Sequence, residues 1–115
     1  MSPSAEVVQR QLDAYNSQDI ELFLACYAVD AQLAVLNGAV THAGQDAIRA
    51  RHESLFSEFP ENRATLVNRI DLGTTVIDHE AVERTAGGER FDVAAIYTIR
   101  DGKIARVDFA RAGAV

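Results

Sequence analysis

The second half of the chain alternates between β-rich segments and short turns, and this order restricts the fold more than any other feature. Four such segments occur, at residues 65–72, 74–84, 90–100 and 103–111. Ala86-Gly87-Gly88 and Asp101-Gly102 separate the last three as hairpin turns. Because strands joined by tight turns pair antiparallel, this half predicts an antiparallel sheet.

The first half has helical periodicity instead. Three helices are expected: residues 5–15, a short helix that Asp19 caps, and residues 45–59, which Pro60 ends. Their apolar stripes consist of Val8, Leu12 and Tyr15 with Gln11 beside them, then Ile20, Phe23, Leu24 and Tyr27, then Ile48, His52, Leu55, Phe56 and Phe59. Between the helices, residues 31–36 read as a buried strand that ends at the turn dipeptide Asn37-Gly38.

Helices that precede antiparallel strands define the α+β class, with the helices on one face of a bent sheet. The 115 residues, 48% of them hydrophobic, are enough for one buried core, so we expect a single domain over residues 1–115. We expect the sheet and helices to enclose an apolar pocket for a small molecule.

Charge and cysteine content exclude several classes of function. The net charge of −6 opposes binding to nucleic acid or to an anionic membrane surface. Neither a signal-like N-terminus nor an apolar run of about 20 residues is present. A single cysteine, Cys26, forms no internal disulfide, which fits a cytoplasmic protein. Without a metal-spaced cluster or a glycine-rich phosphate loop, we expect no metal and no cofactor.

Four segments together carry a resemblance to a known family: Tyr15-Asn16-Ser17-Gln18-Asp19, Tyr27-Ala28-Val29-Asp30-Ala31, Gly44-Gln45-Asp46-Ala47-Ile48, and residues 96–109. They resemble the nuclear transport factor 2-like superfamily, in particular its SnoaL-like branch. The resemblance covers nearly the whole chain and implies a cystatin-like α+β cone, a curved antiparallel or mixed sheet wrapped around the N-terminal helices. It does not fix the activity, because the superfamily includes isomerases, cyclases, epoxide hydrolases, dehydratases and non-enzymes.

Two enzyme families of this superfamily have their catalytic residues replaced here. The oxyanion-hole tyrosine, general-base aspartate and protonated aspartate of ketosteroid isomerases fall on Gln11, Val35 and Ala95. The first-strand and middle-strand residues of limonene epoxide hydrolases fall on Leu33, Val35, Glu80 and Val82. Neither known mechanism is retained.

His52 is the most informative polar residue, because it lies within the apolar stripe of the third helix. A desolvated imidazole could act as a general base or acid. The alternative is a core histidine satisfied by a backbone carbonyl or by Gln11, which the resemblance to the isomerases places opposite it.

Glu80 is the second candidate for catalysis. Strand alternation sends Asp78, Glu80 and Val82 to one face, which the hydrolase overlay places on the pocket side, and His79 to the other. A buried carboxylate would have a raised pKa unless a cation pairs with it, and Arg111 or Arg84 is the expected partner. His79 on the outer face fits a dimer contact better than catalysis.

The remaining pocket-facing candidates are side chains expected to bind the ligand rather than to react. They are Gln11, Tyr15, Leu33, Val35, Phe56, Val82, Ala95, Tyr97, Val107, Phe109 and Arg111. Tyr15 and Tyr97 could also be ordinary core tyrosines. His42 is expected in a loop at the pocket mouth, and Cys26 is not expected to be a nucleophile.

The sequence favours a cofactor-independent enzyme that acts on a small hydrophobic metabolite by proton transfer, through isomerisation, cyclisation or dehydration, with His52 or Glu80 as base. The alternative is a non-catalytic binding or dimeric scaffold module. A transport adaptor would need an exposed apolar patch. Either main hypothesis predicts a homodimer through the outer sheet face, which would carry Ile77, Ala81, Ala94, Ile96 and Ile104.

Overall fold

Three helices precede most of the sheet in the computed structural model, which describes residues 1–113. They are α1 (Pro3–Ser17), α2 (Ile20–Ala25) and α3 (Gln45–Glu58). The Ser2 side chain accepts the N–H of Ala5 to cap α1, and the Asp19 side chain accepts the N–H of Leu22 to cap α2. The predicted helices are therefore present with ends close to those expected. None of the helices in residues 1–113 is long and apolar enough to cross a membrane.

Six strands form one curved, unclosed sheet in the order β2-β1-β6-β5-β4-β3. They are β1 (Tyr27–Val35), β2 (Val40–Ala43), β3 (Arg63–Asp71), β4 (Thr75–Glu83), β5 (Arg90–Arg100) and β6 (Lys103–Arg111). β1 runs parallel to β6 and every other neighbouring pair is antiparallel. The sheet is therefore mixed, and the α+β cone expected from the sequence is confirmed.

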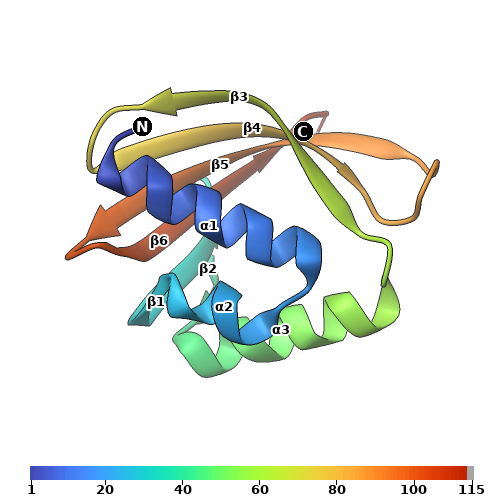
Figure 1. Ribbon diagram of the computed structural model, residues 1–115, viewed down its shortest axis with the longest axis horizontal. Helices are drawn as coiled ribbons and strands as arrows, with labels where there is room; N and C mark the ends of the chain where they lie inside the picture. Colours follow the sequence, from blue (N-terminus) through green and yellow to red (C-terminus); the bar gives the residue numbers. More distant parts are fainter. Residues whose placement is uncertain (114–115) are drawn as a thin grey trace.

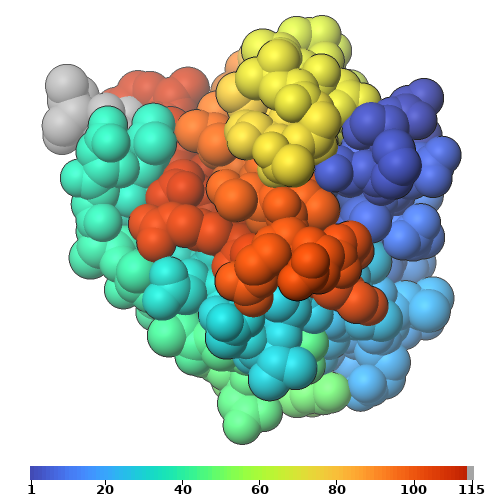
Figure 2. Space-filling model, turned by 90° about the vertical axis from the view of Figure 1, so that its left-hand side faces the viewer, coloured from blue at the N-terminus to red at the C-terminus, as the bar shows by residue number. Residues whose placement is uncertain are grey.

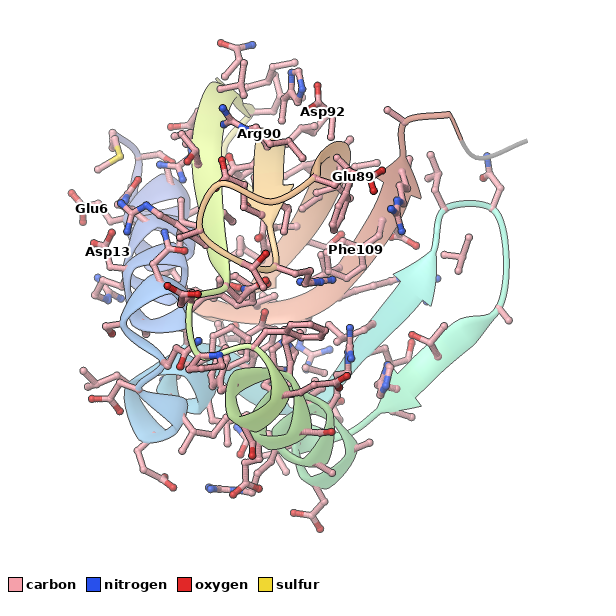
Figure 3. All side chains as sticks on the ribbon, turned by 90° about the vertical axis from the view of Figure 1, so that its right-hand side faces the viewer. Glu6, Asp13, Glu89, Arg90, Asp92 and Phe109 are labelled. Atoms are coloured by element: carbon pink, nitrogen blue, oxygen red, sulfur yellow. The ribbon has the colours of Figure 1, made fainter. Side chains whose placement is uncertain are left out.

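The helices cover one face of the sheet (Figure 1). α1 contacts β3, β4 and β6, whereas α3 contacts β1 and β2. The first residues lie against the turn between β3 and β4 (Figure 2), where Ser2 donates from its N–H and its hydroxyl to Asp71. On β6, Phe109 lies on the helix side of the sheet, whereas Arg90 and Asp92 of β5 project away from the helices (Figure 3).

Local details differ from the sequence prediction in three places. Tyr27, which the periodicity places on a helical stripe, is the first residue of β1. His42 lies in the short edge strand β2 rather than in a loop. Ile104, expected on the outer face, is fully buried in the core, because the register of β5 and β6 shifts between Thr98 and Ile99. Such a bulge moves a residue to the opposite face.

A second bulge interrupts β3. Leu66 pairs with Glu80 and Asn68 pairs with His79, so Val67 between them has no partner on β4. Beyond this bulge Arg69 pairs with Asp78 and therefore lies on the helix side of the sheet.

Candidate functional site

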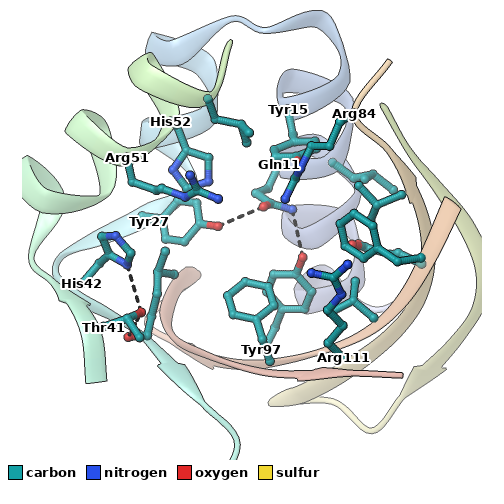
Figure 4. Close-up of a pocket in the computed structure, with 18 residues that line it drawn as sticks. Gln11, Tyr15, Tyr27, Thr41, His42, Arg51, His52, Arg84, Tyr97 and Arg111 are labelled. Atoms are coloured by element: carbon teal, nitrogen blue, oxygen red, sulfur yellow. Dashed lines mark hydrogen bonds between the residues drawn. The ribbon is translucent and has the colours of Figure 1, made fainter. Parts of the chain in front are cut away.

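The concave face of the sheet, α1 and α3 enclose a cavity of about 320 Å³ (Figure 4). Its lining is apolar with polar groups at both ends: Gln11, Leu12, Tyr15, Tyr27, Leu33, Thr41, His42, Arg51, His52, Leu55, Glu80, Val82, Arg84, Phe91, Val93, Tyr97, Phe109 and Arg111. The buried end holds Gln11, Tyr27, Tyr97 and Glu80, each no more than 6% exposed. The rim holds the exposed Arg51 and Arg111.

A chain of three hydrogen-bonded side chains crosses the buried end. The Tyr27 hydroxyl donates to Gln11 Oε1 at 2.9 Å, and Gln11 Nε2 donates to the Tyr97 hydroxyl at 3.3 Å (Figure 4). Burial raises the pKa of both tyrosines well above the usual value, so both hydroxyls stay protonated. Since Tyr97 accepts from Gln11, its own proton is available to donate to a ligand oxygen.

Glu80 lies beside this chain and is the buried carboxyl of the pocket. Within residues 1–113, its Oε2 is buried and has no hydrogen-bond partner. Burial, with a smaller contribution from the charge of Asp78, raises the pKa of Glu80 from 4.5 to about 7, although Arg69 partly opposes the shift. The group therefore exists in both protonation states near neutral pH.

Asp78, two residues earlier on the same face of β4, pairs with Arg69, whereas Glu80 has no such cationic partner among residues 1–113. Arg69 Nε donates to Asp78 Oδ1 at 2.7 Å and Nη2 donates to Oδ2 at 2.9 Å. Arg69 also donates to Gln9 Oε1 at 2.8 Å, which ties the pair to α1. Asp78 is fully buried, so the two-point contact compensates for the desolvation of its charge.

The predicted ion pair of Glu80 with Arg111 or Arg84 is therefore wrong. Arg84 and Arg111 lie over the Phe91 ring, with their guanidinium carbons 5.1 and 4.0 Å from its centroid. The cation that pairs with the buried Asp78 of β4 comes instead from the neighbouring strand β3.

His52 lies in the lining on α3, among Tyr15, Phe23 and Phe56. Its Nδ1 is 2.8 Å from the carbonyl oxygen of Ile48, so Nδ1 carries the proton and Nε2 does not. Burial is the main cause that lowers the pKa of His52 to about 4. Its partner is thus a backbone carbonyl and not Gln11, and the imidazole is a neutral hydrogen-bond acceptor at pH 7.

The rim is organised around Arg84 on the sheet side. Arg84 Nη1 donates to Asn62 Oδ1 at 2.7 Å, and both Asn62 Nδ2 and Arg84 contact the Tyr15 hydroxyl, at 2.8 and 3.4 Å. On the opposite side, His42 bonds Thr41 through Nδ1. Partial burial, followed by the nearby charge of Arg51, lowers the pKa of His42.

Most of the residues proposed from the sequence line the cavity, but four ligand-binding candidates lie outside it. Val35 is the last residue of β1 and is 52% exposed. Ala95 and Val107 are fully buried in the core, and Phe56 packs against Tyr15 instead.

Several lining residues were not among the proposed ligand-binding residues. They are Leu12, Tyr27, Thr41, His42, Arg51, Leu55, Arg84, Phe91 and Val93. Phe91 and Val93 alternate with Tyr97 along β5, and the strand period alone places them on its pocket-facing side. Tyr27 carries no such signal, because its apparent helical phase points to a different element.

Two other polar side chains lie outside the cavity. His79 is exposed on the outer face, where its Nε2 lies 2.9 Å from Asp92. Cys26 is buried, and burial raises the pKa of its thiol, which is unfavourable for a nucleophile. Among residues 1–113 no three metal-ligating side chains cluster.

Comparisons with known proteins agree with this fold. The family model described as a SnoaL-like domain matches residues 8–107. The chain is 32% identical to an uncharacterised cystatin-fold protein from Novosphingobium aromaticivorans, with a TM-score of 0.87, over 96% of this chain and 99% of that one. A search of curated proteins found no significant match.

Two more distant structures share the fold. A proposed polyketide cyclase from Sinorhizobium meliloti is 23% identical, with a TM-score of 0.79, over 91% of this chain and 94% of that one. A proposed ketosteroid isomerase from Kribbella flavida is 17% identical, with a TM-score of 0.83, over 98% of this chain and 80% of that one. The family model and the cystatin-fold relative place the fold in the nuclear transport factor 2-like superfamily. Within it, the chain belongs to the SnoaL-like domain family.

Proposed function

We propose that the chain is a cofactor-independent enzyme that transfers a proton within a small hydrophobic molecule, with Glu80 as the base. The observation that carries the proposal is the Glu80 carboxyl, which lies at the buried end of the cavity with an oxygen that no group in residues 1–113 satisfies. A pKa of about 7 makes Glu80 both a competent base and a competent acid near neutral pH.

The neighbouring hydroxyl of Tyr97 supplies the complementary function. In the proposed step the Glu80 carboxylate removes a proton from a carbon adjacent to a carbonyl, and the electron pair moves onto the carbonyl oxygen. The Tyr97 O–H donates to that developing oxyanion, and the Tyr27–Gln11 chain polarises Tyr97. Protonated Glu80 then returns the proton to another carbon, which completes an isomerisation. In a cyclisation the enolate carbon attacks a second carbonyl, whose π bond breaks, and protonated Glu80 gives its proton to the resulting alkoxide.

Glu80 is a better candidate for the base than His52, because of the contacts that His52 makes. With a pKa of about 4 its imidazole is a weak base at pH 7, and its Nδ1 proton is bound to the Ile48 carbonyl. We assign Nε2 of His52 to accept a hydrogen bond from a ligand hydroxyl.

The fold is compatible with this chemistry. The SnoaL-like family and the likeness to a proposed polyketide cyclase and a proposed ketosteroid isomerase support a small-molecule site in this cavity.

Proton exchange tests the proposal and does not require the natural substrate. A panel of small cyclic ketones and diketones is incubated with the protein in D₂O, and NMR follows the loss of the α-proton signals. We expect exchange faster than in buffer, rising with pH through about 7, because Glu80 must be ionised to act as base. Glu80→Gln should lower the rate about 100-fold or more, and Tyr97→Phe should lower it with little change in fold.

His79→Ala on the outer face is the matched control and should leave the rate unchanged. Equal rates for wild type and Glu80→Gln would refute the mechanism. Compounds that bind without exchange would favour a non-catalytic binding module, which the mutual bonding of Gln11, Tyr27 and Tyr97 also allows.

A further inference from the structure

The charges that line the cavity are opposite in sign to the charge of the whole chain. The chain has a net charge of −6, yet Arg51, Arg84 and Arg111 line the cavity, and Glu80 is the acidic residue of the lining. A concave surface with one sign of charge and apolar walls concentrates ligands of the opposite sign. An acidic protein gains nothing in solubility from cations gathered there, so their placement points to a ligand.

The arginines that line the cavity also differ from most of the others in their partners. Outside the cavity, Arg49, Arg69, Arg90, Arg100 and Arg106 each pair with a carboxylate, whereas Arg10 and Arg63 have none within 4.0 Å among residues 1–113. Within the part of the chain that the structure describes, none of the three lining arginines has a carboxylate within 4.0 Å.

Two of the three are held in place by contacts that leave donors available. The Arg111 guanidinium carbon lies 4.0 Å from the centre of the Phe91 ring, and stacking restricts its position without using its N–H groups. Arg84 lies over the same ring and is fixed through Nη1 by Asn62, which is 2% exposed, so Nη2 and Nε stay available. The side chains of Arg84 and Arg111 frame one side of the cavity (Figure 4).

We propose that the ligand is a small hydrophobic molecule with a carboxylate group, which Arg111 and Arg84 bind at the rim while its apolar part extends inward to Glu80. This assigns a substrate class to the proposed enzyme and rests on that proposal for the role of Glu80. Guanidinium groups match the two oxygens of a carboxylate, and the apolar lining matches the remainder of such a molecule.

Two aromatic probes of nearly the same shape separate the effect of a ligand's carboxylate charge from the effect of its shape. Naphthoate and naphthamide have nearly the same shape, but only the first is anionic at pH 7. Isothermal titration calorimetry should give about tenfold or more tighter binding of naphthoate to the wild-type protein, and the difference should shrink as salt is raised. Arg111→Gln and the double variant Arg84→Gln/Arg111→Gln should reduce or abolish the preference.

Arg100→Gln is the matched control, because Arg100 pairs with Asp30 outside the cavity. It should keep the full preference. Equal affinities of the two probes, an unchanged preference in the double variant, or no binding of either probe at millimolar concentration would overturn the proposal. A preserved naphthoate preference with no proton exchange by the wild type would refute only the enzyme mechanism, so the two failures are distinguishable.

Discussion

Glu80 and His52 should impose opposite pH dependences on the stability of the protein. The pKa of Glu80 is raised from 4.5 to about 7, whereas the pKa of His52 is lowered from 6.5 to about 4, and burial is the main cause of both shifts. Folding therefore favours the neutral form of each group. Glu80 stabilises the fold below pH 4.5 and loses that contribution as the pH rises to 7. His52 stabilises the fold above pH 6.5 and loses that contribution as the pH falls to 4.

Each shift of two and a half pH units corresponds to about 3 kcal/mol of unfolding free energy. Between pH 4.5 and 6.5 the two contributions have opposite slopes and nearly cancel in the wild-type protein. Substituting one of the two groups should therefore reveal the pH dependence of stability that the other contributes. The unfolding free energy of Glu80→Gln, minus that of the wild type, should rise by about 3 kcal/mol between pH 4.5 and 7. For His52→Gln the same difference should fall by about 3 kcal/mol between pH 4 and 6.5.

Urea denaturation followed by circular dichroism at half-unit pH intervals measures both differences. Subtracting the wild-type curve removes the contributions of other carboxylates that all the proteins share. Glu61→Gln, at an exposed position, is the control for the loss of one carboxylate. If the difference for Glu80→Gln varies with pH no more than that of this control, Glu80 is not desolvated in the folded protein, which would remove the basis for its role as base.

Three further outcomes follow from other contacts. Asp78→Asn leaves the guanidinium of Arg69 without its buried partner, and denaturation should show a loss of about 3–5 kcal/mol. Asn16→Ala removes two hydrogen bonds that join the end of α1 to the main chain of Ala64, and the same measurement should show a loss of about 1–3 kcal/mol. The outer sheet face remains a predicted dimer interface: light scattering at micromolar concentration should give twice the monomer mass, Ile96→Asp should halve it, and a wild-type monomer would contradict the prediction.

The sequence predicts the fold and the orientation of β4 well, because both depend on local periodicity. Helical spacing places Gln11 on the buried face of α1, and strand alternation places Asp78 and Glu80 on the helix side. Wherever a bulge shifts the register, the same reasoning fails. Ile104 turns into the core for this reason.

The partners within the site were less predictable, because they depend on contacts between distant segments. Gln11 bonds Tyr27 and Tyr97, which lie 16 and 86 residues away in the sequence. No local pattern specifies which of several inward polar groups will meet. Local patterns likewise do not specify whether Asp78 or Glu80 pairs with an arginine.

That choice follows from the single unpaired residue Val67. With continuous pairing from Leu66 and Glu80, Asn68 would face Asp78 and Arg69 would point to the outer face. The extra residue advances the register by one, so Arg69 reaches Asp78 on the pocket side. Glu80 lies before the bulge, opposite the apolar Leu66, and so keeps a buried carboxyl without a cation. A bulge in the neighbouring strand thus divides two carboxyls of one strand into a structural ion pair and a group with a pKa of about 7.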